Sequence, residues 1–273
     1  MPAMPPKPNG WRQRWPGWGK RGPVPMTGIV LATITPGKPE IFAALQGEGV
    51  SAGQPCVFVR LSRCNLACRW CDTAYTWRFE SDSRPHTDEL SYNRAANQVT
   101  LDEADVARRI HALGQSRLVI TGGEPLLQSP ALVRMLDALA TLGTYQIEIE
   151  TNGSVNPPKV LTTRVHQWNV SPKLAHSGNA RNLAIRPDAL AMFVACKQAF
   201  FKFVIAEPAD VDEVATLAQT HAIPPSRILL MPEGRDSAAL HARLRWMADL
   251  CLERGYTLSD RLHIHLFGDT RGT

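Results

Sequence analysis

The segment that indicates the fold reads Val57-Phe-Val-Arg-Leu-Ser-Arg-Cys64-Asn-Leu-Ala-Cys68-Arg-Trp-Cys71-Asp-Thr73. Its aliphatic start predicts a buried strand, and three cysteines spaced C-x3-C-x2-C follow that strand directly. Closed zinc sites and ferredoxin clusters take four protein ligands, so three thiolates leave one coordination position open for another group. Thiolates favour zinc, copper(I) or iron–sulfur over hard cations. The segment therefore predicts a strand that leads into a reactive metal centre.

Short aliphatic runs continue along the chain, and longer segments of helical period separate them. The predicted strands are 56–61, 118–121, 146–150, 167–170, 200–205 and 227–231. The predicted helices are 104–113, 130–142, 214–218 and 237–253. This alternation is typical of an α/β fold with a mostly parallel sheet, which either closes partway into a barrel or spreads as a doubly wound sheet. In both arrangements ligands bind at the carboxyl ends of the strands.

Local patterns add detail to this prediction. Thr100 with Glu103, and Asp210 with Glu213, have the spacing of capping boxes and predict where two helices begin. His263 and His265 alternate along a run that we expect to be a strand, with both histidines structural. The segment 76–98 is polar and aperiodic, which is typical of a lid or a disordered insertion.

Turn motifs end the later strands. Thr121-Gly-Gly-Glu-Pro125 follows the second predicted strand, and its paired glycines permit positive φ and a close approach of the backbone to a ligand. The next strands end in Thr151-Asn-Gly153, Ser171-Pro-Lys173 and Met231-Pro-Glu-Gly234. Each of these alone is typical of a plain turn. Because they follow one another along one rim of the sheet, we expect them to line a binding site.

The charge of the chain is concentrated at its amino terminus. The net charge of the 273 residues is +5, and residues 1–25 hold five basic side chains, no acid, seven prolines and three of the seven tryptophans. We predict that 1–25 is a disordered basic leader and that 26–273 is one domain; a misassigned start, with Met26 as the true one, and a functional basic tail are equally open. The rest of the chain carries 25 basic and 25 acidic residues, which predicts no direct contact with nucleic acid.

The chain offers no sign of export or of a membrane span. Its longest uncharged apolar run, 189–196, has eight residues, whereas a span needs about 18–20. The leader lacks the apolar core of a signal peptide. We therefore expect a cytoplasmic protein with reduced cysteines, in which Cys56, Cys196 and Cys251 are inert packing residues.

The cysteine spacing and the Thr121–Pro125 motif, in this order, resemble the radical S-adenosylmethionine (SAM) superfamily. The resemblance implies a partial (β/α)6-type barrel with a 4Fe–4S cluster on Cys64, Cys68 and Cys71. It implies that SAM chelates the fourth iron and that an electron from the cluster cleaves SAM to methionine and a 5′-deoxyadenosyl radical, with no catalytic side chain beyond these groups. The residues that it assigns to SAM are Trp70, Cys71, Asp72, Gly123, Ser171, Pro172, Lys173, Met231, Pro232, Glu233 and Gly234.

Within that superfamily the chain resembles the family of 7-carboxy-7-deazaguanine synthases. The resemblance rests on Leu45-Gln-Gly-Glu-Gly49, Phe58-Val-Arg-Leu61, Cys71-Asp-Thr73 and the final Leu262-His-Ile-His-Leu-Phe-Gly-Asp-Thr-Arg-Gly272. It implies a lyase that contracts the ring of 6-carboxy-5,6,7,8-tetrahydropterin to 7-carboxy-7-deazaguanine with loss of ammonia. The product belongs to queuosine and 7-deazapurine biosynthesis, a tRNA modification pathway. The family also implies a homodimer and an electron donor such as flavodoxin.

This resemblance assigns the pterin site to Leu45, Gln46, Gly47, Glu48, Arg60 and Thr121. Amide and carboxylate groups suit the donor and acceptor edge of a pterin, and the guanidinium of Arg60 suits its carboxylate. Thr73 matches the magnesium ligand of the family, because a hydroxyl with substrate oxygens and water can form part of the shell of a hard cation. The chain departs from the family at Arg63, where many members carry a glycine before the first cluster cysteine.

Two other functions compete with this interpretation. Another small radical enzyme, such as a glycyl-radical-enzyme activase, would share the cysteines and the glycine pair but would not need Gln46, Glu48 and Thr73 together. A zinc-binding RNA or protein adaptor would take His86 as its fourth ligand and the basic leader as an electrostatic arm. Iron and sulfide content separates the adaptor from both enzymes.

Overall fold

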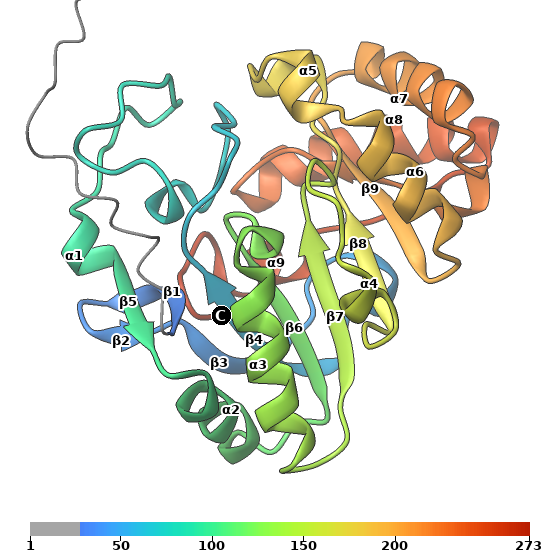
Figure 1. Ribbon diagram of the computed structural model, residues 1–273. Helices are drawn as coiled ribbons and strands as arrows, with labels where there is room; N and C mark the ends of the chain where they lie inside the picture. Colours follow the sequence, from blue (N-terminus) through green and yellow to red (C-terminus); the bar gives the residue numbers. More distant parts are fainter. Residues whose placement is uncertain (1–27) are drawn as a thin grey trace, which may run out of the picture.

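The computed structural model describes residues 28–273, and the predicted leader 1–25 lies outside them (Figure 1). Its centre is a row of parallel strands in the order β4-β6-β7-β8-β9-β10. Their bounds are β4 Pro55–Leu61, β6 Arg117–Gly122, β7 Gln146–Thr151, β8 Gln167–Val170, β9 Ala199–Ile205 and β10 Ile228–Pro232. The two ends of this row do not pair with each other, so the sheet is a partial barrel. The predicted α/β class and all six predicted strands are confirmed.

Shorter strands extend the two edges of the sheet. Beside β4 lie the antiparallel strands β1 (Ile29–Thr35) and β3 (Ile41–Leu45), and β1 in turn pairs with β2 (Lys38–Pro39) and β5 (Gln98–Leu101). Beyond β10 lies β11 (Thr257–Leu258). The sequence analysis missed these strands because most of them are short and carry exposed or polar residues at several positions.

Helices cover the parallel strands and connect them in sequence. The longer helices are α2 (Glu103–Ala112), α3 (Ser129–Ala140), α6 (Pro187–Ala195), α7 (Pro208–His221) and α8 (Ser237–Arg254). The short ones are α1 (Arg94–Asn97), α4 (Lys159–Thr162), α5 (Arg181–Ala184) and α9 (Leu262–Phe267). One large hydrophobic core joins the strands to α2, α3, α6, α7 and α8. No helix among residues 28–273 combines the length and apolarity needed to cross a membrane.

The structure corrects three local predictions. Asp102, not Thr100, caps α2, because its carboxylate accepts hydrogen bonds from two backbone N–H groups of the first turn while Thr100 belongs to β5. The capping box of α7 is formed by Glu207 and Asp210, so this helix begins earlier than predicted. The histidine run is not a strand but α9, which leaves the sheet after β11.

The segment 76–98 packs onto the cysteine loop. Its Trp77, Phe79 and His86 are buried, and the backbone N–H of Thr87 donates to the carbonyl of Arg69 at 2.8 Å. Figure 1 shows this segment beside the carboxyl end of β4, with α1 and β5 at its far end. Of the two alternatives, the structure therefore shows a folded cover over the cysteine loop.

Candidate functional site

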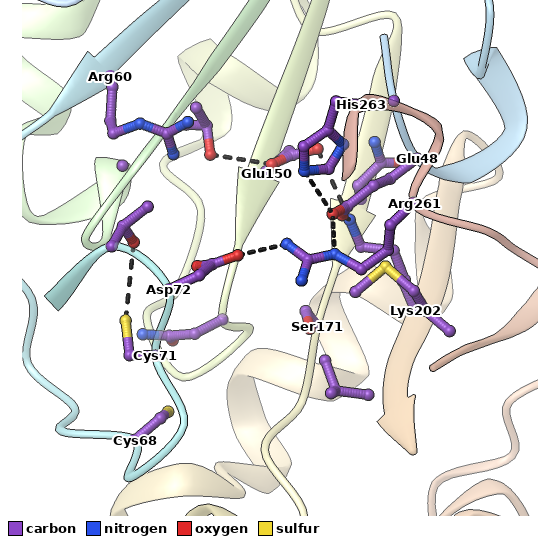
Figure 2. Close-up of a pocket in the computed structure, with 18 of the residues that line it drawn as sticks. Glu48, Arg60, Cys68, Cys71, Asp72, Glu150, Ser171, Lys202, Arg261 and His263 are labelled. Atoms are coloured by element: carbon purple, nitrogen blue, oxygen red, sulfur yellow. Dashed lines mark hydrogen bonds and ion pairs between the residues drawn. The ribbon is translucent and has the colours of Figure 1, made fainter. Parts of the chain in front are cut away.

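One cavity of about 200 Å³ lies at the carboxyl ends of the parallel strands. The cysteine loop forms one side of it, and the turns after β3 and β10 with the segment before α9 form the other. All the residues assigned above to the cluster, SAM, pterin and magnesium line this cavity except Pro172, which is buried. Figure 2 shows Cys68 and Cys71 on one side and Glu48, Lys202, Arg261 and His263 on the other.

The three cysteines are free thiols surrounded by hydrogen-bond donors. Asn179 Nδ2 lies 3.3 Å from Cys68 Sγ, and the Cys64 sulfur faces Asn152 Nδ2 at 3.9 Å. Burial raises the pKa of all three thiols, that of Cys71 to about 11, so a cationic centre is needed to hold them together as thiolates. Donors to the sulfurs are typical of iron–sulfur sites, where they tune the reduction potential.

The thiols are not arranged around a single ion. Among residues 28–273, no group of three His, Cys, Asp or Glu side chains is placed to share one metal ion. Each cysteine of a 4Fe–4S cluster binds a different iron, so its ligands need not converge on one point. His86 is engaged by the backbone on both ring nitrogens, with Nε2 2.8 Å from the Cys71 carbonyl and Nδ1 accepting from the N–H of Asp88. His86 therefore does not serve as a fourth zinc ligand in this arrangement.

The glycine pair after β6 brings the chain close to the cysteine loop. A Cβ on Gly122 would lie 2.1 Å from the Leu61 carbonyl oxygen, and one on Gly123 would lie 2.0 Å from that of Arg63. Arg63 itself has φ of +79°, a left-handed conformation that favours glycine. The sequence analysis expected the pair to admit a ligand; the structure shows that it also admits the backbone that carries Cys64. The departure at Arg63 retains the backbone conformation that a glycine would take there.

The SAM side of the cavity is formed by an aromatic and by polar turns. The Trp70 ring stacks on His176 with centroids 5.4 Å apart, and the ammonium of Lys173 lies 5.6 Å from the Trp70 centroid. Trp70 Nε1 is buried without a hydrogen-bond partner among residues 28–273. Lys173 also donates to Ser171 Oγ at 2.8 Å. An unpartnered indole N–H beside an ammonium is suited to a polar ligand that supplies acceptors.

On the opposite side, Glu48 lies between two buried cations. Lys202 donates to Glu48 Oε2, and Arg261 Nε donates to Oε1 at 2.9 Å. Burial alone would raise the pKa of Glu48, but the two cations outweigh it and hold that pKa well below its ordinary value. Glu48 is therefore an ionised acceptor at neutral pH. Burial lowers the pKa of the neighbouring His263, so this imidazole is neutral there.

The amide of Gln46, which the resemblance assigns to the pterin, forms its hydrogen bonds within the protein. Its Nε2 donates to Glu148 at 2.7 Å and to Glu150 at 3.3 Å, and its Oε1 accepts from the backbone N–H of Glu48 at 3.3 Å. The side chain is 1% exposed. Its amide is thus used within the protein, where it orders the turn that carries Glu48.

Arg60 and Thr121 are neighbours because β4 and β6 pair in that register. Arg60 Nε donates to Glu40 at 2.7 Å, and Tyr75 donates to the same carboxylate. Its two Nη groups form no hydrogen bond within residues 28–273, and Arg60 lines the cavity, so these groups are available to a ligand carboxylate. Thr121 Oγ1 donates to Glu150 at 2.9 Å, which places a second carboxylate in the cavity.

Several residues of this site were missed by the sequence analysis. Lys202, Glu150 and Arg261 line the cavity and form its ion pairs, and His263, expected to be structural, lines it too. The sequence held one usable signal, since Lys202 interrupts an otherwise apolar run in Ala199–Ile205. A charge inside a buried strand requires a partner. Arg261 and Glu150 gave no comparable signal.

Known proteins resemble this chain in sequence and in structure. A profile of the radical SAM superfamily matches residues 59–164. The chain is similar to the 7-carboxy-7-deazaguanine synthase of Pyrobaculum aerophilum, with 34% identity over 234 residues that cover 85% of this chain and 95% of that protein. It is 36% identical over 255 residues to the enzyme of the same name from Halobacterium salinarum, covering 86% and 91%. The crystal structure of QueE from Escherichia coli superposes with a TM-score of 0.62 and 27% identity, covering 86% and 95%.

Proposed function

The chain belongs to the 7-carboxy-7-deazaguanine synthase family of radical SAM enzymes, and on that premise we propose that it converts 6-carboxy-5,6,7,8-tetrahydropterin to 7-carboxy-7-deazaguanine. The observation that carries the proposal is that one cavity is lined both by the three cysteines and by Glu48 and Arg60. A glycyl-radical-enzyme activase would not need the second set, and the relatives favour the synthase.

The donor set fits the groups that the family implies. Cys64, Cys68 and Cys71 would hold a 4Fe–4S cluster, and the turns at 171–173 and 231–234 with Trp70 would hold SAM. Together these groups supply the one-electron chemistry that abstracts a hydrogen from the substrate. The protein would orient the two ligands, and the folded segment 76–98, which packs over the cysteine loop, would limit the access of water to them.

The charges of the opposite side suit the proposed substrate. The ionised Glu48 accepts hydrogen bonds and therefore selects the N–H groups along the pyrimidine edge of a pterin. The free Nη groups of Arg60 are suited to the substrate carboxylate, because a guanidinium binds carboxylates in a forked geometry. Thr121 lies beside Arg60 and contributes a hydroxyl.

The proposal also includes a magnesium ion bound at Thr73. Thr73 lines the cavity and its Oγ1 lies 3.6 Å from Cys71 Sγ, so a cation bound there would lie next to the cluster. A hydroxyl, substrate oxygens and water are the ligands that magnesium prefers. Thr73→Val should abolish the stimulation of turnover by added magnesium while iron content stays that of the wild type; equal stimulation of both proteins would contradict the assignment.

The remaining expectations concern the cellular setting. We propose that residues 26–273 form one catalytic domain of a cytoplasmic homodimer. An electron donor of the flavodoxin type would reduce the cluster, and the product would enter queuosine and tRNA modification without direct contact between this protein and nucleic acid. The absence of a membrane-spanning helix among the described residues is consistent with this setting.

The test is an anaerobic reconstitution with iron and sulfide, followed by incubation with SAM, reductant, magnesium and 6-carboxytetrahydropterin. Mass spectrometry should detect 7-carboxy-7-deazaguanine. Formation of 5′-deoxyadenosine without that product would retain the radical chemistry and refute the substrate. Formation of neither, with zinc bound in place of iron, would favour the adaptor.

A further inference from the structure

Arg261 joins three segments of the cavity that are far apart in the sequence. Its side chain, between β11 and α9, is 7% exposed. Nε donates to Glu48 at 2.9 Å, and Nη1 donates to the carbonyl of Gly234 at 2.5 Å. Nη2 donates to Asp72. In Figure 2 the guanidinium lies between the two carboxylates, so one side chain contacts the loops after β3, β4 and β10.

The partners of Arg261 carry the different tasks of the site. Glu48 is the ionised acceptor on the substrate side. Asp72 directly follows the cluster cysteine Cys71 and precedes the proposed magnesium ligand. Gly234 ends the turn after β10, which lines the cavity and which the family resemblance assigns to SAM. A shift of this guanidinium therefore changes the relation between substrate, cluster and SAM at once.

A guanidinium is the group that these contacts require. Arg261 is within hydrogen-bond distance of both carboxylates and of the Gly234 carbonyl at the same time. Within residues 28–273, Arg261 is the only hydrogen-bond donor to the Asp72 carboxylate. Lys202 donates to the other carboxylate oxygen of Glu48, and within residues 28–273 it forms no hydrogen bond or ion pair with Asp72. A planar fork can bind two carboxylates and a carbonyl together, whereas a lysine ammonium is a single point charge on a flexible stem.

The backbone fixes Arg261 to the substrate loop as well. The N–H of Leu262 donates to the Gly47 carbonyl at 2.8 Å. Gly47 packs so closely against His263 that a Cβ there would lie 2.2 Å from the ring Nδ1. The segment 261–263 is therefore packed directly against the turn that carries Glu48.

We propose that Arg261 is a positioning residue that holds Glu48 and the cluster loop at a fixed separation, so that the reacting hydrogen of the bound pterin faces SAM. This inference rests on the proposed function. Its physical basis is orientation, because a misplacement of about 1 Å can cost roughly 100-fold in rate. Arg261 acts through its partners and does not itself transfer a proton or an electron.

The test compares Arg261→Lys and Arg261→Gln with the wild type after reconstitution. Arg227→Gln is the control, because Arg227 is another arginine that joins segments by hydrogen bonds, here to two backbone carbonyls, but lies at the amino end of β10, outside the cavity. The readouts are iron per chain, the electron paramagnetic resonance spectrum of the reduced cluster, the melting temperature, and the amount of 5′-deoxyadenosine released for each 7-carboxy-7-deazaguanine formed.

Both Arg261 variants should bind iron as the wild type does and should release about tenfold more 5′-deoxyadenosine per product, because SAM is cleaved before the substrate is aligned. Arg261→Lys keeps the positive charge beside Glu48, so it should lose less stability than Arg261→Gln and should still release excess 5′-deoxyadenosine per product. Arg227→Gln should keep the wild-type ratio of 5′-deoxyadenosine to product. The inference is overturned if Arg261→Lys keeps the wild-type ratio, or if the control is equally uncoupled. A wild type that forms no 7-carboxy-7-deazaguanine would instead refute the proposed function, and this inference with it.

Discussion

The two sides of the cavity are built in different ways. The cysteine side comes from one short stretch, 64–71, whose ligands are placed by local spacing after β4. The substrate side comes from segments that meet only in the fold, among them Glu48, Arg60, Lys202 and Arg261. The cysteine side requires a bound cationic centre to keep its buried thiols as thiolates, whereas the substrate side contains compensating charges of its own. A metal site can thus be encoded locally, while a preformed charge network depends on the whole barrel.

The largest effect is expected on the cysteine side. Cys68→Ala should abolish cluster assembly and all cleavage of SAM, because the two remaining thiolates cannot hold the cluster. Iron analysis and assay of 5′-deoxyadenosine measure both losses. Cys251→Ala is the control, since Cys251 is buried in α8 away from the cavity and should leave the iron content unchanged. Full iron binding by Cys68→Ala would show that the cluster is not encoded by this stretch.

Arg60→Ala tests whether the substrate side is independent of the cluster. It should retain the cluster and lower kcat/KM for the pterin by about 10- to 100-fold, because a charged hydrogen bond contributes about 1.5–3 kcal/mol. The control Arg134→Gln breaks an ion pair with Glu103 between α2 and α3 and should turn over normally. If Arg60→Ala keeps full activity on the pterin, the assignment of the substrate carboxylate is wrong.

The contact between Gly47 and His263 tests how tightly the substrate side is packed. Gly47→Ala should destabilise the fold by about 1–3 kcal/mol, because the new methyl group overlaps the imidazole. Thermal unfolding measures the loss. In the double variant with His263→Ala the added methyl group should cost much less stability, because the effects of two substitutions at residues in contact are not additive. An additive result would mean that the two residues are not in contact.

The smallest effect concerns the backbone before the first cysteine. Because Arg63 has φ of +79°, Arg63→Gly should be more stable than Arg63→Ala by about 1–2 kcal/mol, the cost of a Cβ in the left-handed region. Both variants remove the arginine side chain, so their difference reports only the backbone. Equal melting temperatures would show that this turn relaxes without strain, and the cysteine side would then be less rigid than the structure indicates.

Much of the fold could be predicted from the sequence, because β4, β6, β9 and β10 are short, mostly apolar runs that are nearly all buried. The strands β3 and β5 could not, because short edge strands with exposed positions lack a period of their own. By contrast, β1 is a mostly buried seven-residue run that the sequence analysis overlooked. On the cysteine side the spacing of Cys64, Cys68 and Cys71 was sufficient to predict that the three thiols line one cavity after β4.

On the substrate side the sequence indicated Glu48 and Arg60 only through a family resemblance. It did not indicate that the Gln46 amide donates hydrogen bonds to Glu148 and Glu150, because hydrogen bonds between residues about a hundred positions apart leave no local pattern. For the same reason the sequence did not indicate the role of Arg261, whose carboxylate partners lie 213 and 189 residues away in the chain.

The central claim is that the two sides of the cavity serve one reaction. The most direct measurement is to supply 6-carboxytetrahydropterin carrying deuterium at C6 to the reconstituted enzyme and to determine the label in SAM and 5′-deoxyadenosine. The account predicts that deuterium from the pterin appears in these adenosyl compounds while 7-carboxy-7-deazaguanine forms, because the atom passes between ligands held on opposite sides of one cavity. Formation of product with adenosyl compounds that stay unlabelled would contradict it.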